Sequence, residues 1–128
     1  MDHARDQKNP LREIEFYLHQ NELDKAVDFA RNAPVEAYLL SRIALSITKN
    51  EPQTAIDFNM RSATSIAIQA NNHAYDEAVD ILVKLASVLE PKWKTVYLQS
   101  VAQLREVASL RRKPNFIKAL DRKFPLPP

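Results

Sequence analysis

Apolar residues recur at steps of three and four along most of this chain, a spacing that places side chains on one face of an α-helix. The clearest stripe follows Pro91 and consists of Trp93, Val96, Tyr97, Val101, Leu104, Val107 and Ala108. These segments leave almost no residues for strands. The pattern predicts an all-α fold of about seven helices in antiparallel hairpins, near residues 11–20, 22–33, 35–49, 52–70, 74–89, 91–111 and 114–123.

The predicted helix over residues 35–49 differs from the others, because its apolar residues cover most of the helix circumference. They are Val35, Tyr38, Leu39, Leu40, Ile43, Ala44, Leu45 and Ile47. A helix that is apolar on most sides usually has neighbours on several sides. The pattern therefore predicts that this helix forms the centre of the core.

A short sequence pattern occurs three times, each time with an alanine, an apolar residue and an aspartate in succession. The three alanines are Ala26, Ala55 and Ala78, separated by 29 and 23 residues. This spacing is about the length of one helix-turn-helix, the unit of helical repeat proteins. A small side chain in the second helix of a hairpin lets two helices approach closely. We therefore expect these alanines to pack the repeats together.

The chain contains no glycine, so other residues must begin and end its helices. Asparagine tolerates the left-handed backbone conformation that often ends a helix. The sequence therefore predicts helix ends at Asn21, Asn32, Asn50 and Asn71. Proline suits the first turn of a helix, and helix starts are predicted at Pro10, Pro34, Pro52, Pro91 and Pro114.

A tyrosine and three small residues are spaced across the first two predicted helices, at Tyr17, Ala26, Ala30 and Ala33. Their spacing resembles the tyrosine and small positions of the tetratricopeptide repeat (TPR) family. The turn carries Gln20 and Asn21 where that repeat usually has glycine, and the units do not recur at the family's regular length of about 34 residues. The resemblance implies a TPR-like, right-handed helical repeat or bundle.

A second set of residues runs from residue 72 to residue 124. Its members are Tyr75, Ala78, Leu82, Trp93, Tyr97, Leu98, Leu104, Arg105, Arg111, Arg112, Lys113, Phe116, Leu120 and Asp121. These positions resemble the C-terminal helical region of bacterial SWIM zinc-finger proteins. The cysteines of that zinc finger are absent from this sequence, so the resemblance implies an accessory helical domain without the zinc.

The 128-residue chain is long enough for one domain with a single core, and 45% of its residues are hydrophobic. We predict one helical-repeat domain over residues 1–128, with a polar N-terminal arm at 1–10 and a proline-rich tail at 124–128. The lack of cysteine excludes disulfides and thiolate zinc sites, and it favours a reducing compartment. The polar start of the sequence and the lack of a long apolar stretch predict a cytoplasmic protein.

The residues that commonly serve catalysis or metal binding form no motif in this sequence. No two histidines lie four residues apart, as two ligands on one helix face would, because they are His3, His19 and His73. His73 lies near Asp76, Glu77 and Asp80, but acidic residues in a first helical turn also complement the helix dipole. The sequence therefore predicts no enzyme activity, no cofactor and no metal site.

Charge is distributed unevenly along the chain. Residues 1–90 hold nine Lys and Arg against fourteen Asp and Glu, whereas residues 91–128 hold nine against two, so their net charges are −5 and +7. The basic end is suited either to phosphate or acidic partners, or to packing beside the acidic part of the chain. The predicted basic patch comprises Arg105, Arg111, Arg112, Lys113, Lys118, Arg122 and Lys123.

Two aromatic residues, Trp93 and Tyr97, lie one helical turn apart. They belong either to the core, which is the favoured interpretation, or to a groove that accepts a partner peptide. Together with Phe116 they lie on apolar stripes, and they are not interleaved with the basic residues as in surfaces that stack nucleic-acid bases. Nucleic acid is therefore the second choice of partner.

We expect a non-catalytic module for protein–protein interaction or assembly, with an accessory nucleic-acid-associated domain as the alternative. In stacked hairpins the first helices commonly form a concave binding face. Here these are the helices near 11–20, 35–49 and 74–89, and the residues expected to contact the partner are Arg12, Glu13, Arg42 and Lys49. The expected partner is another protein or protein segment, or a second copy of the chain, and not a membrane.

Overall fold

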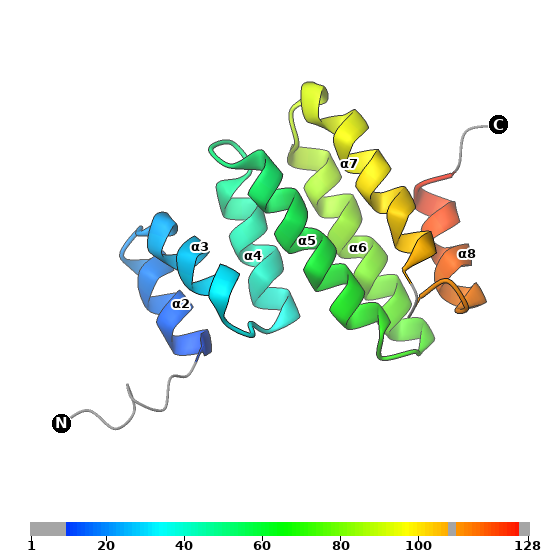
Figure 1. Ribbon diagram of the computed structural model, residues 1–128, viewed down its shortest axis with the longest axis horizontal. Coiled ribbons are helices and arrows are strands. Elements are labelled where there is room, and N and C mark those ends of the chain that lie inside the picture. Colours follow the sequence, from blue (N-terminus) through cyan, green and yellow to red (C-terminus); the bar gives the residue numbers. More distant parts are fainter. Residues whose placement is uncertain (1–9, 108–109, 126–128) are drawn as a thin grey trace.

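The computed structural model describes residues 10–107 and 110–125, and these residues form helices and no strand (Figure 1). The all-α prediction is confirmed, and six of the seven predicted helices lie within three residues of the observed bounds. The predicted N-terminal arm lies outside the described residues except for Pro10, and so does the tail after Pro125. The helices are α2 (Pro10–His19), α3 (Leu23–Asn32), α4 (Ala37–Ile47), α5 (Pro52–Ala67), α6 (Asn72–Val88), α7 (Pro91–Gln103), the 3₁₀ turn η1 (Leu104–Glu106) and α8 (Pro114–Lys123).

The helices pack in chain order, from α2 and α3 at one end of the molecule to α7 and α8 at the other (Figure 1). Each helix from α2 to α6 packs on the next. Contacts also join α4 to α6 and α5 to α7. Alternate helices therefore lie side by side, with α4 and α6 in one layer and α5 and α7 in a second. α8 departs from this order, because it packs on α6.

α4, the helix predicted to form the centre of the core, has seven of its eleven residues buried and packs against α3, α5 and α6. Tyr38 and Leu45 of α4 are 46% and 37% exposed, so one side of this helix faces solvent. α6 packs against α4, α5, α7 and α8, and α5 packs against α4, α6 and α7. α4 and α5 therefore each have three neighbouring helices and α6 has four, so α4 shares the centre of the core with α5 and α6.

The three alanines of the repeated pattern are all fully buried. Ala26 lies on α3, Ala55 on α5 and Ala78 on α6. α5 and α6 are consecutive helices, so the last two copies belong to one helix pair and not to two separate hairpins. The copies therefore mark close helix packing, but they do not define a regular hairpin repeat.

The predicted helix boundaries are confirmed at some positions and corrected at others. Asn21 has φ 58°, as expected for the left-handed end of a helix. After α5, however, the left-handed residue is Ala70, with φ 60°, and Asn71 instead caps the start of α6 by accepting the Ala74 N–H at 2.8 Å. Pro34 does not begin a helix, because α4 starts at Ala37. The other four predicted prolines are each the first residue of a helix, at Pro10, Pro52, Pro91 and Pro114.

The helix predicted over residues 91–111 ends earlier than expected. α7 ends at Gln103, η1 follows, and Val107 has an extended backbone with φ −63° and ψ 127°. Ala108, the last residue of the predicted stripe, lies outside the described residues. The periodicity of Leu104 and Val107 continues past the end of α7, because both residues still pack against the core. After the end of α7 and the extended residue Val107, the chain returns so that α8 packs on α6.

A buried polar cluster joins α5, α6 and α7. Asn59 of α5 is fully buried, and its Nδ2 donates to the Ile81 carbonyl at 3.1 Å and to the Tyr97 hydroxyl at 3.3 Å. The Tyr97 hydroxyl donates in turn to the Leu82 carbonyl at 2.5 Å. Tyr97 is 1% exposed, which confirms the core interpretation for this residue, whereas Trp93 is half-buried at the edge of the core. These hydrogen bonds fix the register of three helices.

Burial raises the pKa of the Tyr97 hydroxyl far above its ordinary value of 10.0. The unfolded chain ionises this hydroxyl near its ordinary pKa, whereas the folded protein keeps it neutral. The stability that depends on neutral Tyr97 is therefore fully present below about pH 10 and is lost as the pH rises above it.

Replacing Tyr97 with phenylalanine should remove this alkaline sensitivity. At pH 8 we expect the variant to lose about 0.5–1.5 kcal/mol with the hydrogen bond to Leu82. Between pH 8 and pH 10.5 the wild type should lose about 1 kcal/mol more than the variant, because only the wild type has this hydroxyl to ionise. Urea unfolding of both proteins at the two pH values measures the difference. An equal loss in both would contradict the assignment.

Candidate protein-binding groove

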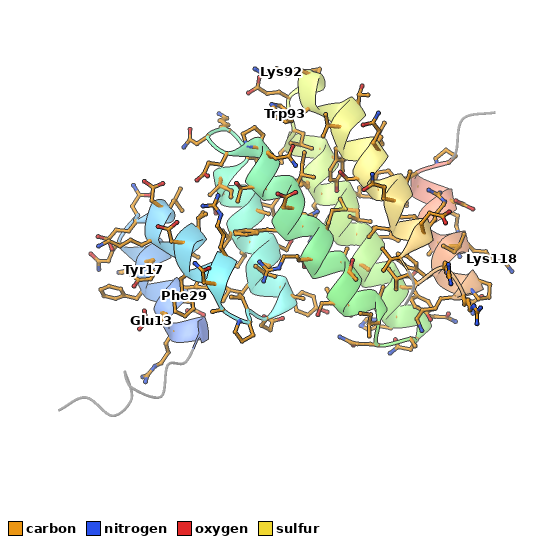
Figure 2. The ribbon with its side chains drawn as sticks, viewed as in Figure 1. Glu13, Tyr17, Phe29, Lys92, Trp93 and Lys118 are labelled. Atoms are coloured by element: carbon orange, nitrogen blue, oxygen red, sulfur yellow. The ribbon has the colours of Figure 1, made fainter. Side chains whose placement is uncertain are left out.

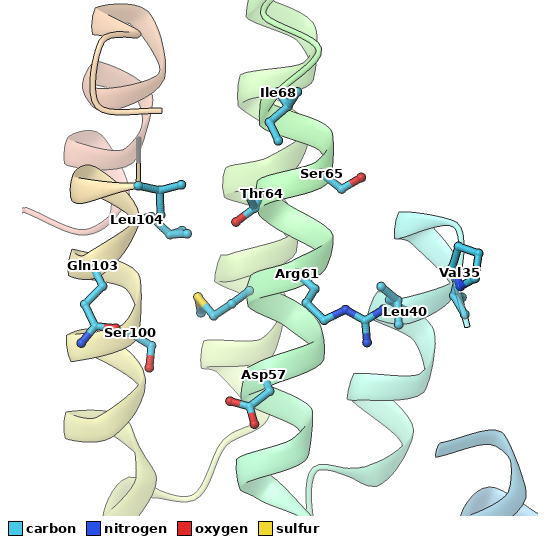
Figure 3. A pocket seen from close by; sticks show the side chains of 13 residues that line it. Val35, Leu40, Asp57, Arg61, Thr64, Ser65, Ile68, Ser100, Gln103 and Leu104 are labelled. Atoms are coloured by element: carbon cyan, nitrogen blue, oxygen red, sulfur yellow. The ribbon is translucent and has the colours of Figure 1, made fainter. Parts of the chain in front are cut away.

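A groove of about 740 Å³ crosses the outer surface of α5 (Figure 3). α5 forms its floor, the α3–α4 linker and α4 form one wall, and the end of α7 with η1 forms the other. The lining residues are Pro34, Val35, Leu40, Asp57, Met60, Arg61, Thr64, Ser65, Ile68, Ser100, Gln103, Leu104 and Val107.

The floor of the groove is one face of a single helix and its C-cap residue. Its residues are spaced by three or four along α5, so they share one side of the helix (Figure 3). The opposite side carries fully buried residues such as Ala55, Ile56 and Asn59. Met60 on the floor is half-buried and Ile68 is 50% exposed. α5 therefore presents apolar side chains on the groove side as well as on the core side.

Two charged residues lie in the groove, and both have partners within the described structure. The Arg61 guanidinium donates through Nη1 to the Ala30 carbonyl at 3.1 Å and lies 5.5 Å from the centre of the Phe58 ring. Asp57 accepts from the Gln53 side chain at 3.1 Å. Arg61 thereby ties α5 to the end of α3. The remaining polar groups of the groove are the hydroxyls and the amide of Thr64, Ser65, Ser100 and Gln103.

The predicted protein-binding residues lie on other parts of the molecule. Arg12 and Glu13 are on α2, Arg42 is exposed on α4, and Lys49 is exposed in the turn before α5. Partial burial and then the carboxylate of Glu13 raise the pKa of the Tyr17 hydroxyl. Arg42 lines a pocket between α4 and α6. The four residues therefore come from three segments of the fold, namely α2, α4 and the turn before α5.

The pocket lined by Arg42 is a smaller groove of about 240 Å³ between α4 and α6. Glu77 lies in it, accepts from the Tyr38 hydroxyl, and pairs with His73 Nε2 at 2.8 Å. The hydrogen bond to Glu77 raises the pKa of the Tyr38 hydroxyl. This face contains Arg42 and Lys84 beside Glu77 and Asp80, so its charges are balanced. In the described ranges no three His, Asp or Glu side chains are placed to hold a metal ion.

The predicted basic patch is divided by the fold. Arg105 is largely buried, since its side chain is 12% exposed, pairs with Asp121 and donates to the Phe124 carbonyl at 3.0 Å. It therefore tethers η1 to α8 and does not belong to an exposed basic face. Lys113 is half-buried at the start of α8, and the exposed members of the patch are Arg111, Arg112, Lys118, Arg122 and Lys123.

Reasoning from the sequence missed the groove residues Met60 and Ile68. Both are apolar, and Met60 packs against the edge of the core whereas Ile68 is 50% exposed. The available signal was that α5 carries these apolar residues in addition to its fully buried ones. A second apolar face on a helix is a sign of a further contact surface.

Comparison of the chain with protein-family models, with curated proteins and with solved structures finds no match. No helix within the described residues is long and apolar enough to cross a membrane.

Proposed function

We propose that this protein is a non-catalytic helical-repeat module that binds an amphipathic segment of another protein in the groove across α5. The observation that carries the proposal is the pair of apolar side chains on the floor of the groove, with Ile68 half exposed and Met60 half-buried two turns earlier on α5. Helical proteins commonly receive the apolar face of a partner segment in such a groove. Contiguous exposed apolar surface on a small domain is a common sign of such contacts.

The composition of the walls supports a peptide segment as the occupant. Val35 and Leu104 provide apolar contact on the two sides, and Thr64, Ser65 and Gln103 provide hydrogen-bonding groups next to it. An apolar centre with a few polar groups around it suits a segment that buries one face and keeps its polar groups hydrogen-bonded at the rim. Charged groups contribute less, because Asp57 and Arg61 already have partners.

The TPR-like part of the proposal is supported by the succession of paired helices and by the full burial of Ala26 and Ala30 in α3. The accessory-domain part is supported by contacts among the residues that carry the second resemblance. The Tyr75 and Phe116 rings are 5.7 Å apart, and Arg105 pairs with Asp121. We further propose that the module works in the cytoplasm, in line with its lack of cysteine.

Replacing Ile68 with glutamate should reduce partner binding by about tenfold or more, because a carboxylate loses hydration when it is buried against an apolar segment. The matched control is Val88→Glu, since Val88 is 51% exposed and does not line the groove. The full chain is immobilised, and proteins captured from a lysate of the source organism are quantified for wild type and both variants. We expect Ile68→Glu to lose one set of the proteins that the wild type captures. We expect Val88→Glu to retain that set.

Equal capture by wild type and Ile68→Glu would contradict the groove as the binding site. A second copy of the chain is the alternative occupant, and sedimentation of the purified protein detects it. Self-association that Ile68→Glu abolishes would keep the groove as the site and replace the foreign partner by a second copy. Capture that both glutamate variants abolish would indicate a general effect of added charge and not the groove.

A further inference from the structure

Five exposed basic residues gather at the C-terminal end of the described chain. We define the α8 cationic surface as Arg111, Arg112, Lys118, Arg122 and Lys123. Arg111 and Arg112 lie in the turn before α8, and Lys118 and Arg122 lie one turn apart on that helix. Lys118 projects from the end of the molecule (Figure 2). The surface is separate from the α5 groove, because none of its residues lines that groove.

The charge of this surface is not neutralised by the rest of the described protein. None of the five residues forms an ion pair with another described residue. Asp121 is the one acidic residue between 110 and 125, and it pairs with Arg105. Asp76 lies near Arg122 in a small pocket of about 200 Å³ but forms no ion pair with it. The Arg105–Asp121 pair therefore engages the one acidic residue of this segment, and the five cations stay free of ion pairs within the described residues.

The side chains between these cations distinguish between two classes of partner. Protein interfaces commonly depend on a few exposed aromatic or large apolar residues at their centre. In the described segment 110–125 no large apolar side chain is strongly exposed, and Leu110, Phe116 and Leu120 are fully buried. Of the aromatic rings in this segment, Phe116 is fully buried and Phe124 is half-buried against the core, so neither is strongly exposed for stacking on unpaired bases. Contacts with phosphate groups need neither feature, because they depend on charge.

We propose that the α8 cationic surface binds a nucleic-acid duplex through its phosphate backbone and does not read the bases. A ten-residue helix such as α8 is about 15 Å long. A DNA duplex carries one negative charge per roughly 1.7 Å of its axis, so about nine phosphate charges lie along that length. Each of the three cations on α8 then has a phosphate within the span of the helix, and Arg111 and Arg112 extend the surface before its first residue. The proposal is independent of the partner in the α5 groove.

The test is a fluorescence-anisotropy titration of a labelled 20-base-pair DNA duplex (a length of about two helical turns) with the full chain at several salt concentrations. Five phosphate contacts give a slope of about −4 to −5 in log affinity against log salt, so affinity should fall by about 500-fold between roughly 50 and 200 mM salt. Arg111→Glu/Lys118→Glu should weaken binding by about two orders of magnitude at low salt and reduce the slope by about 2.

The matched control is Arg42→Glu/Lys49→Glu, which changes the net charge equally at two exposed positions away from α8. This control variant should bind the DNA duplex with nearly the affinity of the wild type. The proposal is overturned if the duplex does not bind at low salt, or if both double variants weaken binding equally. It is also overturned if an acidic polyglutamate peptide binds the α8 cationic surface and the duplex does not, because the partner is then an acidic protein segment. Circular dichroism of both double variants establishes that each keeps its helices.

Discussion

Replacing Phe116 with alanine is expected to lower the free energy of unfolding by about 3–5 kcal/mol, the range for removing a large aromatic side chain from a core. Phe116 is fully buried on α8, and its ring lies 5.7 Å from the ring of Tyr75 on α6. α8 has ten residues and packs on α6. A helix this short is marginal without tertiary packing. Loss of Phe116 therefore removes a central contact that holds α8 in place.

Urea unfolding monitored by circular dichroism measures this loss. The matched control is Phe16→Ala, because Phe16 is 58% exposed and the same substitution there should change stability by less than about 0.5 kcal/mol. Similar losses at the two positions would contradict the burial of Phe116. Because both variants lose the same side chain, the difference between them isolates the contribution of packing.

Replacing Ala55 with leucine is expected to destabilise the protein by about 1–3 kcal/mol, the usual cost of overpacking a filled core. Ala55 is fully buried in the first turns of α5, the helix that packs against α4, α6 and α7. The larger side chain must displace a neighbouring helix or adopt a strained rotamer. For a domain of this size, each 1 kcal/mol lowers the melting temperature by about 3–5 °C.

Thermal unfolding of Ala55→Leu should be compared with that of Ala102→Leu. Ala102 is half-buried on α7 and lines an open pocket of about 450 Å³, which has space for the added atoms. The control should therefore melt close to the wild type. An unchanged melting temperature for Ala55→Leu would mean that the repeated alanine does not mark a close helix contact.

Most of the helices could be predicted from the sequence, because helix periodicity and helix-starting prolines are local properties. The end of α7 could not, since Leu104 and Val107 keep the helical spacing although the chain changes direction after Gln103. That turn is set by the packing of α8 on α6, a contact between segments distant in sequence. The left-handed residue Ala70 was missed for a local reason, because Asn71 has an extended backbone and caps α6 by accepting the Ala74 N–H.

The candidate sites were predicted less well than the fold. The excess of positive charge near the C-terminus could be predicted by counting residues. The distinction between Arg105 and the exposed cations could not, because it depends on the contact of Arg105 with Asp121, sixteen residues later. The α5 groove depends on walls from three separate segments, and no single stretch of sequence contains that arrangement.

The linear packing order gives different parts of the molecule different resistance to local opening. α2 packs mainly on α3, and α3 on α4, whereas α6 is held by α4, α5, α7 and α8. In a stack of this kind each unit is stabilised by its nearest neighbours, so an end unit opens at lower free energy than a central one. We therefore expect backbone amides of α2 and α3 to exchange with solvent through fraying of one hairpin, and those of α5 and α6 to exchange only when the whole domain unfolds.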